Sequence, residues 1–273
     1  MKDYLVLVSC IAFLAFLIPG RFKKYCAIVG WVSIAGFLFA ELPYYFSINN
    51  FMYPAIALLS IPFLYVTIRA LLRDDVRVFQ LSTAAAVAFL IFAPFAYIEP
   101  LGNWLISAVV RQTSAVLALV GYPVLQLDWN MLSRNGFRTE IILACTGIQS
   151  IAIMLGVASA VTTNLRQKLL SFLLIFPTIY ILNILRNVFV ISAYSEQWFP
   201  YWPEIAGNGE YGYESFFWAH NVICELLALF VLIAIAYSLF TIIPQLGSLA
   251  GGLYQLYHGE LMRMSGMEKG KEI

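Results

Sequence analysis

Residues 216–243 read FFWAHNVICELLALFVLIAIAYSLFTII, and this stretch decides the fold class. A helix needs about 20 predominantly apolar residues to cross the hydrocarbon core of a bilayer, and this stretch exceeds that length with a single carboxylate, Glu225. The sequence therefore predicts an all-α polytopic membrane protein, with about seven to eight transmembrane helices in one bundle. The other long apolar stretches are residues 4–19, 25–40, 51–72, 78–98, 104–127, 141–163 and 169–194.

The composition supports this class. Hydrophobic residues make up 62% of the chain and charged residues 11%, whereas a soluble globular domain carries about 25% charged residues. The net charge of +1 and the lack of basic runs argue against a nucleic-acid partner. The four cysteines have no CxxC or other paired spacing, so the sequence indicates neither a metal site nor a disulfide framework, and we expect no cofactor.

Basic residues indicate which loops are cytoplasmic, because Lys and Arg beside short loops stay on that side of the membrane. Eight crossings from an outside N-terminus would place Arg166 and Lys168 outside. That placement conflicts with the rule for basic residues, and the conflict disappears if segment 104–127 does not cross the membrane. The segment also contains Arg111 at its centre, and a charge at mid-span would be costly. We therefore expect an interfacial or re-entrant helix near 104–127 on the outer face, seven crossings and a cytoplasmic C-terminus. The alternative is eight crossings with Arg111 facing the bundle.

Residues 128–140, DWNMLSRNGFRTE, predict a small β-hairpin. Asn135 and Gly136 form a strong two-residue turn signal, because both positions tolerate positive φ. We expect this hairpin on the outer face, leading into Cys145.

Cys145 lies in the run ACTGIQS at residues 144–150, where polar residues interrupt an apolar stretch. If a helix begins near Thr146, its positive end favours the nucleophilic thiolate. The N–H groups of Thr146 and Gly147 would then face a developing oxyanion, and Gln149 would add a donor. Without polar partners, a lone cysteine in a span is usually structural.

Arg186 lies about 12 Å inside the outer end of its span if that helix ends near Tyr194. A guanidinium at this depth needs an anionic partner or a water-filled cavity. It either pairs with Glu225 as a structural contact or holds the substrate carbonyl oxygen or the thiolate. Asn183 and Asn187 lie close enough along the helix to orient it.

His220 begins the last apolar stretch, and an imidazole can take a proton from a thiol and return it to a leaving amine. We place Asn221 and Glu225 among the supporting or substrate-binding residues. A rival arrangement pairs His220 with Cys224, one turn further on the same face. It ranks lower because apolar residues flank Cys224 and no oxyanion donors are evident.

The loop at 196–215 is rich in aromatic residues, interspersed with Glu204, Glu210 and Glu214. It is an aromatic belt at the membrane interface, a lid or groove that grips a peptide, or both.

In their order and spacing, these motifs resemble the exosortase/archaeosortase family of integral membrane proteins. The resemblance covers about residues 101–236. It is carried by Gly121-Tyr122-Pro123-Val124, the hairpin, Ala144-Cys145-Thr146-Gly147-Ile148-Gln149-Ser150, Leu185-Arg186-Asn187 and Trp218-Ala219-His220-Asn221.

The resemblance implies a membrane cysteine protease or transpeptidase in which Cys145 is the nucleophile, Arg186 stabilises the oxyanion and His220 is the acid/base. Such enzymes process secreted surface proteins that end in a short tripartite motif, a hydrophobic helix and a basic end. They are thought to join the new C-terminus, through a thioester, to a lipid or other acceptor. The implied location is the cell membrane, with the active site on the extracytoplasmic side.

This interpretation divides the chain into one transmembrane catalytic domain, 1–243, with scaffold helices at 4–100 and a catalytic core at 101–243. Residues 244–273 would be a cytoplasmic tail, with an interfacial helix at 249–262. Two other classes stay open. One is a transporter or channel using Arg186, His220 and Glu225 along a polar path, although the inverted repeats typical of transporters are not evident. The other is a non-catalytic scaffold for envelope assembly.

Overall fold

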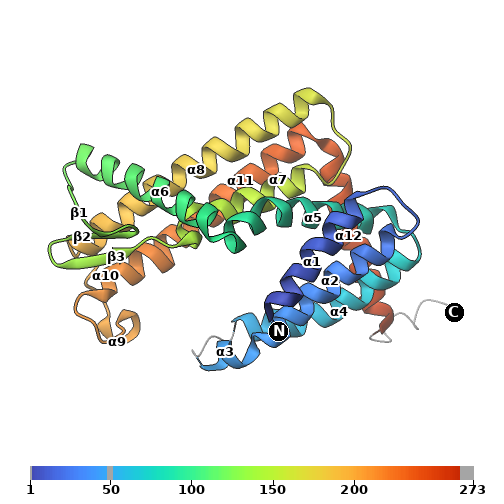
Figure 1. Ribbon diagram of the computed structural model, residues 1–273, viewed down its shortest axis with the longest axis horizontal. Coiled ribbons are helices and arrows are strands. Elements are labelled where there is room, and N and C mark those ends of the chain that lie inside the picture. Colours follow the sequence, from blue (N-terminus) through green and yellow to red (C-terminus); the bar gives the residue numbers. More distant parts are fainter. Residues whose placement is uncertain (1, 48–51, 265–273) are drawn as a thin grey trace. The chain divides into compact units, whose positions relative to one another are not determined.

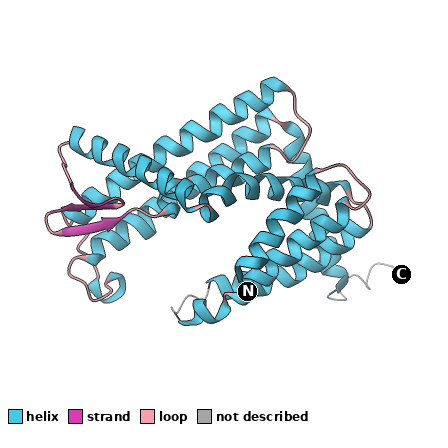
Figure 2. Cartoon of the chain, viewed as in Figure 1, coloured by secondary structure: helices cyan, strands magenta, loops and turns pink. Residues whose placement is uncertain are grey.

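The structure is a computed structural model in which residues 2–47 and 52–264 are described. These residues are mostly helical, with three short strands in one place (Figures 1 and 2). The helices of the N-terminal half are α1 (Lys2–Leu17), α2 (Lys23–Ala40), α3 (Leu42–Ser47), α4 (Met52–Leu72), α5 (Val76–Tyr97) and α6 (Glu99–Leu119). Those that follow are α7 (Ile148–Ala158), α8 (Leu165–Ser195), α9 (Pro203–Ala206), α10 (Tyr213–Phe217), α11 (Glu225–Ile242) and α12 (Pro244–Met264).

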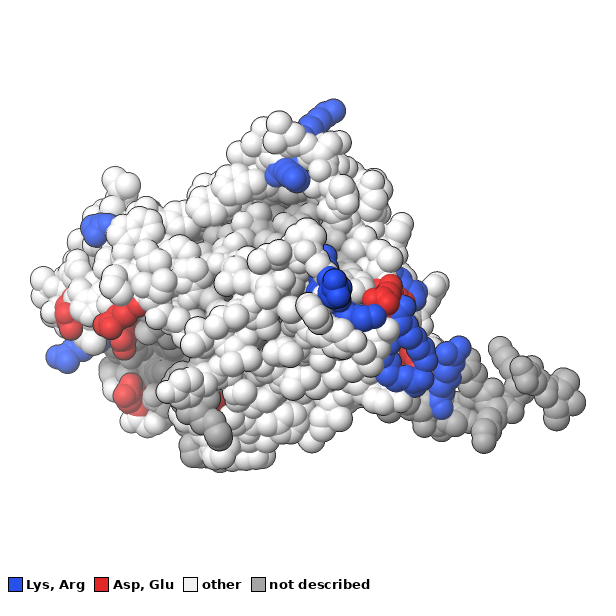
Figure 3. All heavy atoms as spheres, turned by 45° about the vertical axis from the view of Figure 1, so that its right-hand side comes forward, with Lys and Arg blue, Asp and Glu red and all other residues white. Residues whose placement is uncertain are grey.

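Length and composition qualify several helices to cross a membrane, which makes this a multi-pass membrane protein. Within the described residues there are five such segments: Lys23–Phe46, Tyr53–Leu72, Val76–Tyr97, Leu165–Ser195 and Tyr213–Ile242. Two further apolar helices, Tyr4–Leu17 and Ile148–Ala158, are shorter. The count of seven to eight crossings therefore stays a prediction. Figure 3 shows that most of the visible surface carries no charged side chain, as a lipid-facing surface requires.

The chain forms two compact units. Unit 1 comprises residues 1–90, 155–164 and 243–273, and unit 2 comprises residues 91–154 and 165–242. The predicted division into scaffold helices at 4–100 and a catalytic core at 101–243 stays a prediction.

The core of unit 1 lies between α1, α2, α4 and α5. Phe13 and Phe16 are fully buried there with Leu71, and the Phe13 ring meets the Trp31 ring edge-on at 5.7 Å. A Cβ at Gly30 would lie 3.0 Å from the Phe13 ring, so the glycine lets α1 and α2 approach closely.

The basic clusters of unit 1 are joined by ion pairs. Glu260 of α12 is almost fully buried and accepts from Arg73 at 2.9 Å and Arg69 at 3.4 Å. Lys24 pairs with Asp74 at 2.8 Å. Figure 3 shows a surface region where Lys and Arg side chains gather with acidic ones among them.

The Arg77 guanidinium, bonded to Asp75 at 2.6 Å, holds the pKa of that carboxyl below its ordinary value. The helix predicted at 249–262 is longer than expected, since α12 runs from Pro244 to Met264. The rest of the predicted tail, 265–273, lies outside the described residues.

Unit 2 is built around α6 and α8, which pack side by side (Figure 1). Their shared apolar core contains Val109 and Val110 of α6, Leu132 of the sheet, and Ile184 and Val188 of α8.

The predicted hairpin is confirmed. Strands β2 (Met131–Arg134) and β3 (Phe137–Glu140) pair antiparallel, with Arg134 opposite Phe137. The turn residues Asn135 and Gly136 have φ of 52° and 84°, the left-handed values that a two-residue turn of this kind requires. A strand that the sequence did not indicate, β1 (Leu125–Asp128), pairs with β2 and completes a three-stranded sheet.

Two predicted helix boundaries are wrong. The helix predicted at 104–127 is α6, which begins at Glu99 and ends at Leu119, because Gly121 has a φ of 87° and the chain turns there into β1.

The stretch 141–163 is not one helix either. A 3₁₀ turn, η1 (Leu143–Thr146), is followed by Gly147 at a φ of 78°, and α7 begins only at Ile148. The left-handed glycine interrupts the helix and sets Cys145 in the turn that precedes α7.

Candidate active site

Helix α8 holds the main chain of Cys145 in place. The Nδ2 groups of Asn183 and Asn187 both donate to the Cys145 carbonyl oxygen, at 2.6 Å and 2.9 Å. Both asparagines are buried, and their spacing of four residues puts them on one face of the helix. Arg186 belongs to the same turn, so the Cys145 turn and the Arg186 guanidinium are attached to one rigid segment.

The Cys145 side chain is half-buried and packs against the apolar core of α6, β2 and α8. Across the described residues, no hydrogen bond joins its thiol to Arg186 or His220. The turn itself is fixed by main-chain and hydroxyl bonds, since Cys145 N donates to Ile142 O at 2.9 Å and Thr146 Oγ1 donates to Leu143 O at 2.7 Å.

Arg186 and His220 are in direct contact. Arg186 Nη2 lies 3.2 Å from His220 Nε2, and His220 Nδ1 lies 2.6 Å from Asn221 Oδ1. Because the amide oxygen can only accept, Nδ1 carries the proton and Nε2 presents its lone pair to the guanidinium. The ring of Phe216 stacks on the imidazole at 4.9 Å and fixes its plane. Arg186 and His220, each named as a candidate from the sequence, therefore meet in the structure.

His220 lies in a π-helical segment, η2 (Trp218–Cys224), which connects α10 to α11. Such wide turns are rare and often found at functional sites. The segment also brings Cys224, which is buried, to the side of Arg186. No residue pattern indicated this contact, because a π turn has no simple sequence signature.

A cavity of about 360 Å³ lies between the start of α7, α8 and α11. Gly147, Ser150, Asn183 and Arg186 provide its polar wall, and Cys224 also faces it. Apolar side chains line the remainder: Ile179, Leu182, Leu185, Phe189, Ile223, Leu227, Ala228, Val231 and Leu232. The cavity thus places the Arg186 guanidinium beside a long apolar wall. Its lining residue Gly147 is two residues along the chain from Cys145.

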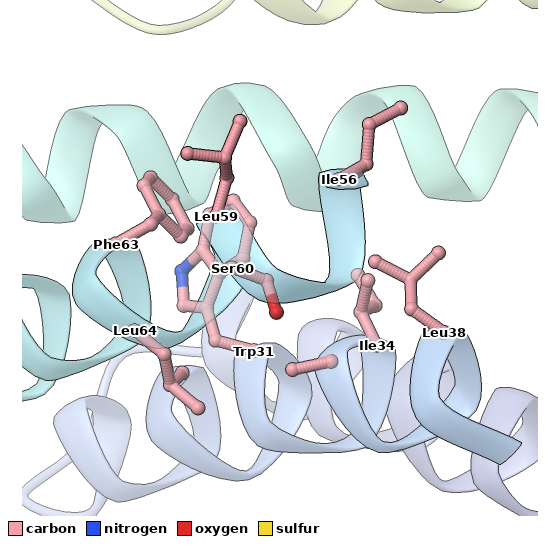
Figure 4. Close-up of a pocket in the computed structure, with 9 residues that line it drawn as sticks. Trp31, Ile34, Leu38, Ile56, Leu59, Ser60, Phe63 and Leu64 are labelled. Atoms are coloured by element: carbon pink, nitrogen blue, oxygen red, sulfur yellow. The ribbon is translucent and has the colours of Figure 1, made fainter. Parts of the chain in front are cut away.

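A second cavity, of about 320 Å³, lies between α2 and α4 in unit 1. Figure 4 shows its lining of aromatic and aliphatic side chains, including Trp31 and Phe63, with Ser60 as a polar member. The Ser60 hydroxyl already donates to Ala57 O at 2.6 Å. Among the described residues that line this cavity there is no thiol, acid or base, so we place the candidate site in unit 2.

The aromatic loop of unit 2 folds beside the candidate site. The Trp218 ring nitrogen donates to Tyr201 O at 2.8 Å, and the Trp202 and Trp218 rings meet at 5.5 Å. Residues 199–202 line a hollow of about 440 Å³ with Trp218 and Ile223, and Ile223 also lines the cavity beside Arg186.

The remaining predicted residues take different positions. Thr146 is buried, and Gln149, Asn221 and Glu225 are exposed. Among residues 2–47 and 52–264 no ion pair joins Arg186 to Glu225, so the structural pair considered from the sequence is not seen. Asn183 and Asn187, expected to orient Arg186, instead donate to Cys145, and their four-residue spacing is the signal that would have indicated a shared target.

These features define a multi-pass membrane protein in which two buried asparagines of α8 hold the main chain of Cys145, while half-buried Arg186 of the same helix contacts half-buried His220. The family model for transmembrane exosortases matches residues 3–212. The chain belongs to this family. The matched range includes Cys145 and Arg186 and ends before His220.

Two relatives are both named archaeosortase A. The protein of Natronomonas pharaonis is 31% identical over 196 residues, which are 64% of this chain and 62% of that protein. The protein of Haloferax volcanii is 26% identical over 241 residues, 79% of each chain. The match to the Natronomonas protein therefore spans less than two thirds of that protein's length. No solved structure matches the chain.

Proposed function

We propose that this chain is a membrane-embedded cysteine transpeptidase that cleaves a C-terminal sorting signal from secreted surface proteins. It would transfer the new C-terminus to a lipid or other acceptor. The observation that carries the proposal is that one turn of α8 holds the Cys145 carbonyl and also carries Arg186, which contacts His220. Membership of the exosortase family and the likeness to two archaeosortases support it.

In the proposed reaction, Cys145 attacks the scissile carbonyl while His220 Nε2 takes the thiol proton. Arg186 turns from the imidazole to the oxyanion and stabilises its charge. The C–N bond breaks as His220 returns the proton to the leaving amine, which leaves a thioester on Cys145. An acceptor hydroxyl or amine then gives its proton to His220 and attacks the thioester. The C–S bond breaks, and the thiolate recovers the proton.

The cavity beside Arg186 supports an apolar substrate. Apart from its polar wall, the cavity is lined by aliphatic and aromatic side chains, mainly of α8 and α11, which suits the hydrophobic helix of a sorting signal or the chain of a lipid acceptor. Such a substrate would lie alongside the helices with its polar motif near the guanidinium. We place the aromatic loop at 199–202 over the motif.

A processing assay tests this function. A secreted reporter that ends in a sorting motif, an apolar helix and basic residues is expressed with and without the chain, and its C-terminus is determined by mass spectrometry. We expect the chain to remove the apolar helix and to leave an added acceptor. A transporter or a scaffold would leave the reporter uncut, and an uncut reporter would refute the proposal that the chain is a transpeptidase.

The proposed topology has the hairpin outside and the basic clusters in the cytoplasm. The ion pairs that join Lys24 of α2 to the α4–α5 loop, and Arg69 of α4 to Glu260 of α12, support one shared side for these segments of unit 1. In a background without the native cysteines, we expect an impermeant maleimide to label Arg138→Cys on intact cells. Lys168→Cys should react only after permeabilisation. Both positions are exposed, so the reverse pattern would invert the topology.

A further inference from the structure

We propose that Asn183 and Asn187 form a two-amide clamp that sets the position of Cys145 relative to Arg186. They would act as positioning residues and not as donors to the substrate. This inference rests on the proposed function, because it assigns the clamp to the thiol that attacks. The observation behind it is that both amides donate to a single main-chain carbonyl, that of Cys145, at 2.6 Å and 2.9 Å.

The break at Gly147 creates the need for such a clamp. With a φ of 78°, Gly147 directs the chain away from a continuous helix, so the Cys145 carbonyl leaves the helical hydrogen-bond ladder. A buried carbonyl must find donors elsewhere. Here it receives two, which use both of its lone pairs and hold it from two directions.

One of the two asparagines also packs closely against the turn that it holds. A Cβ at Gly147 would lie 3.2 Å from Cβ and Cγ of Asn183, so the glycine turn and the asparagine are closely packed. One hydrogen bond would be enough to satisfy the Cys145 carbonyl. A second buried amide costs free energy unless it is hydrogen-bonded, and here it is bonded to the same carbonyl oxygen. The second bond removes the remaining freedom of the turn to slide along α8.

The clamp and the guanidinium share one helical turn. Arg186 is three residues from Asn183 and adjacent to Asn187, and it points to His220 on η2, while the asparagines point to η1. Because α8 is rigid over one turn, the spacing between the thiol and the guanidinium depends on the two amides. A displacement of about 1 Å at a reacting group can cost roughly 10²-fold in rate.

Asn187→Ala is the cleaner test, because Asn183 also lines the cavity. We expect kcat to fall about 10- to 100-fold with little change in KM. The rate at which iodoacetamide alkylates Cys145 without substrate, followed by mass spectrometry of that site, should fall several-fold. Alkylation of Cys224 should stay unchanged. If Asn187→Ala does not fold, Asn187→Ser, whose hydroxyl is too short to reach the carbonyl, replaces it.

A matched control is Asn130→Ala. Asn130 is equally buried in the same unit, and its amide also donates to a main-chain carbonyl, that of Ile141, at 3.4 Å, and to Glu140 at 2.9 Å. The Asn130→Ala variant should lower the amount of folded protein without changing kcat or the rate of Cys145 alkylation. If Asn187→Ala behaves in the same way, the clamp is only structural and the inference is wrong.

A double-mutant cycle completes the test. If the clamp acts by holding the thiol against the guanidinium, Asn187→Ala should cost much less in an Arg186→Lys background than in the wild type. Full additivity of the two losses would overturn the inference. The alkylation rates need no substrate, so they test the clamp even if the processing assay shows no cleavage, a result that would refute the proposed function instead.

Discussion

Cys145→Ala is expected to abolish processing, with a loss of at least about 10³-fold in kcat. Without the nucleophilic thiol, the covalent acyl-enzyme intermediate cannot form. Cys145→Ser should be nearly as damaging, since a hydroxyl in the same turn is far less readily ionised than a thiol. The folded protein should persist in both variants, because the turn is held through the Cys145 carbonyl and not through its side chain. Cleavage of the reporter, compared at equal amounts of folded protein, provides the measurement.

Cys224→Ala is the matched control for this prediction. Cys224 is buried, lines the cavity and lies beside Arg186, so it is the thiol that the geometry offers as a rival. We expect this variant to keep activity within about tenfold, since it loses only part of a cavity wall. Processing that survives Cys145→Ala and disappears in Cys224→Ala would move the nucleophile to η2.

Arg186→Lys is expected to lower kcat/KM by about 10²- to 10³-fold, the size of the loss when one oxyanion donor is removed. Lysine keeps the positive charge but lacks the planar fork, so it cannot present the same oriented N–H donors, first to His220 and then to the oxyanion. KM should change less than kcat, because the apolar cavity wall stays intact. Rates of reporter cleavage over a range of substrate concentrations separate the two constants.

The control for the arginine variant is Arg134→Lys in the same unit. Arg134 also makes oriented contacts, donating to Glu196 and to Pro123 O, both at 2.9 Å. Those contacts tie the hairpin to the end of α8 and to the chain before β1. We expect at most a small loss of stability there and unchanged kcat. Wild-type turnover by Arg186→Lys would show that no oriented guanidinium is needed.

The sequence predicted those parts of the fold that depend on local rules. Long apolar runs predicted the spanning helices, and Asn135-Gly136 predicted the hairpin turn, because each signal acts over a few residues. The boundaries near Gly121 and Gly147 were wrong because an apolar run does not reveal where a glycine adopts a left-handed conformation. Strand β1 was missed for a related reason, since most of it lies in residues assigned to the helix at 104–127, which in the structure ends at Leu119 before the turn at Gly121.

The candidate site was predicted in part. A guanidinium in an apolar span needs a partner, but the partners expected from the sequence were Glu225, the thiolate or the substrate, and the structure has Arg186 against His220 instead. The partners of Asn183 and Asn187 depend instead on where η1 packs against α8, which is a tertiary contact. The approach of Cys224 to Arg186 depends on the π turn, whose extra residue per turn rotates one helix face relative to the next.

Trapping the covalent intermediate shows which cysteine is the nucleophile. The purified wild-type chain is mixed with a sorting-signal peptide, quenched in acid and digested, and the modified peptide is sequenced by mass spectrometry. We expect an acyl adduct on Cys145 that hydroxylamine removes, as a thioester requires. An adduct on Cys224, or cleavage of the peptide with no adduct on any cysteine, would contradict the assignment of Cys145 as the nucleophile.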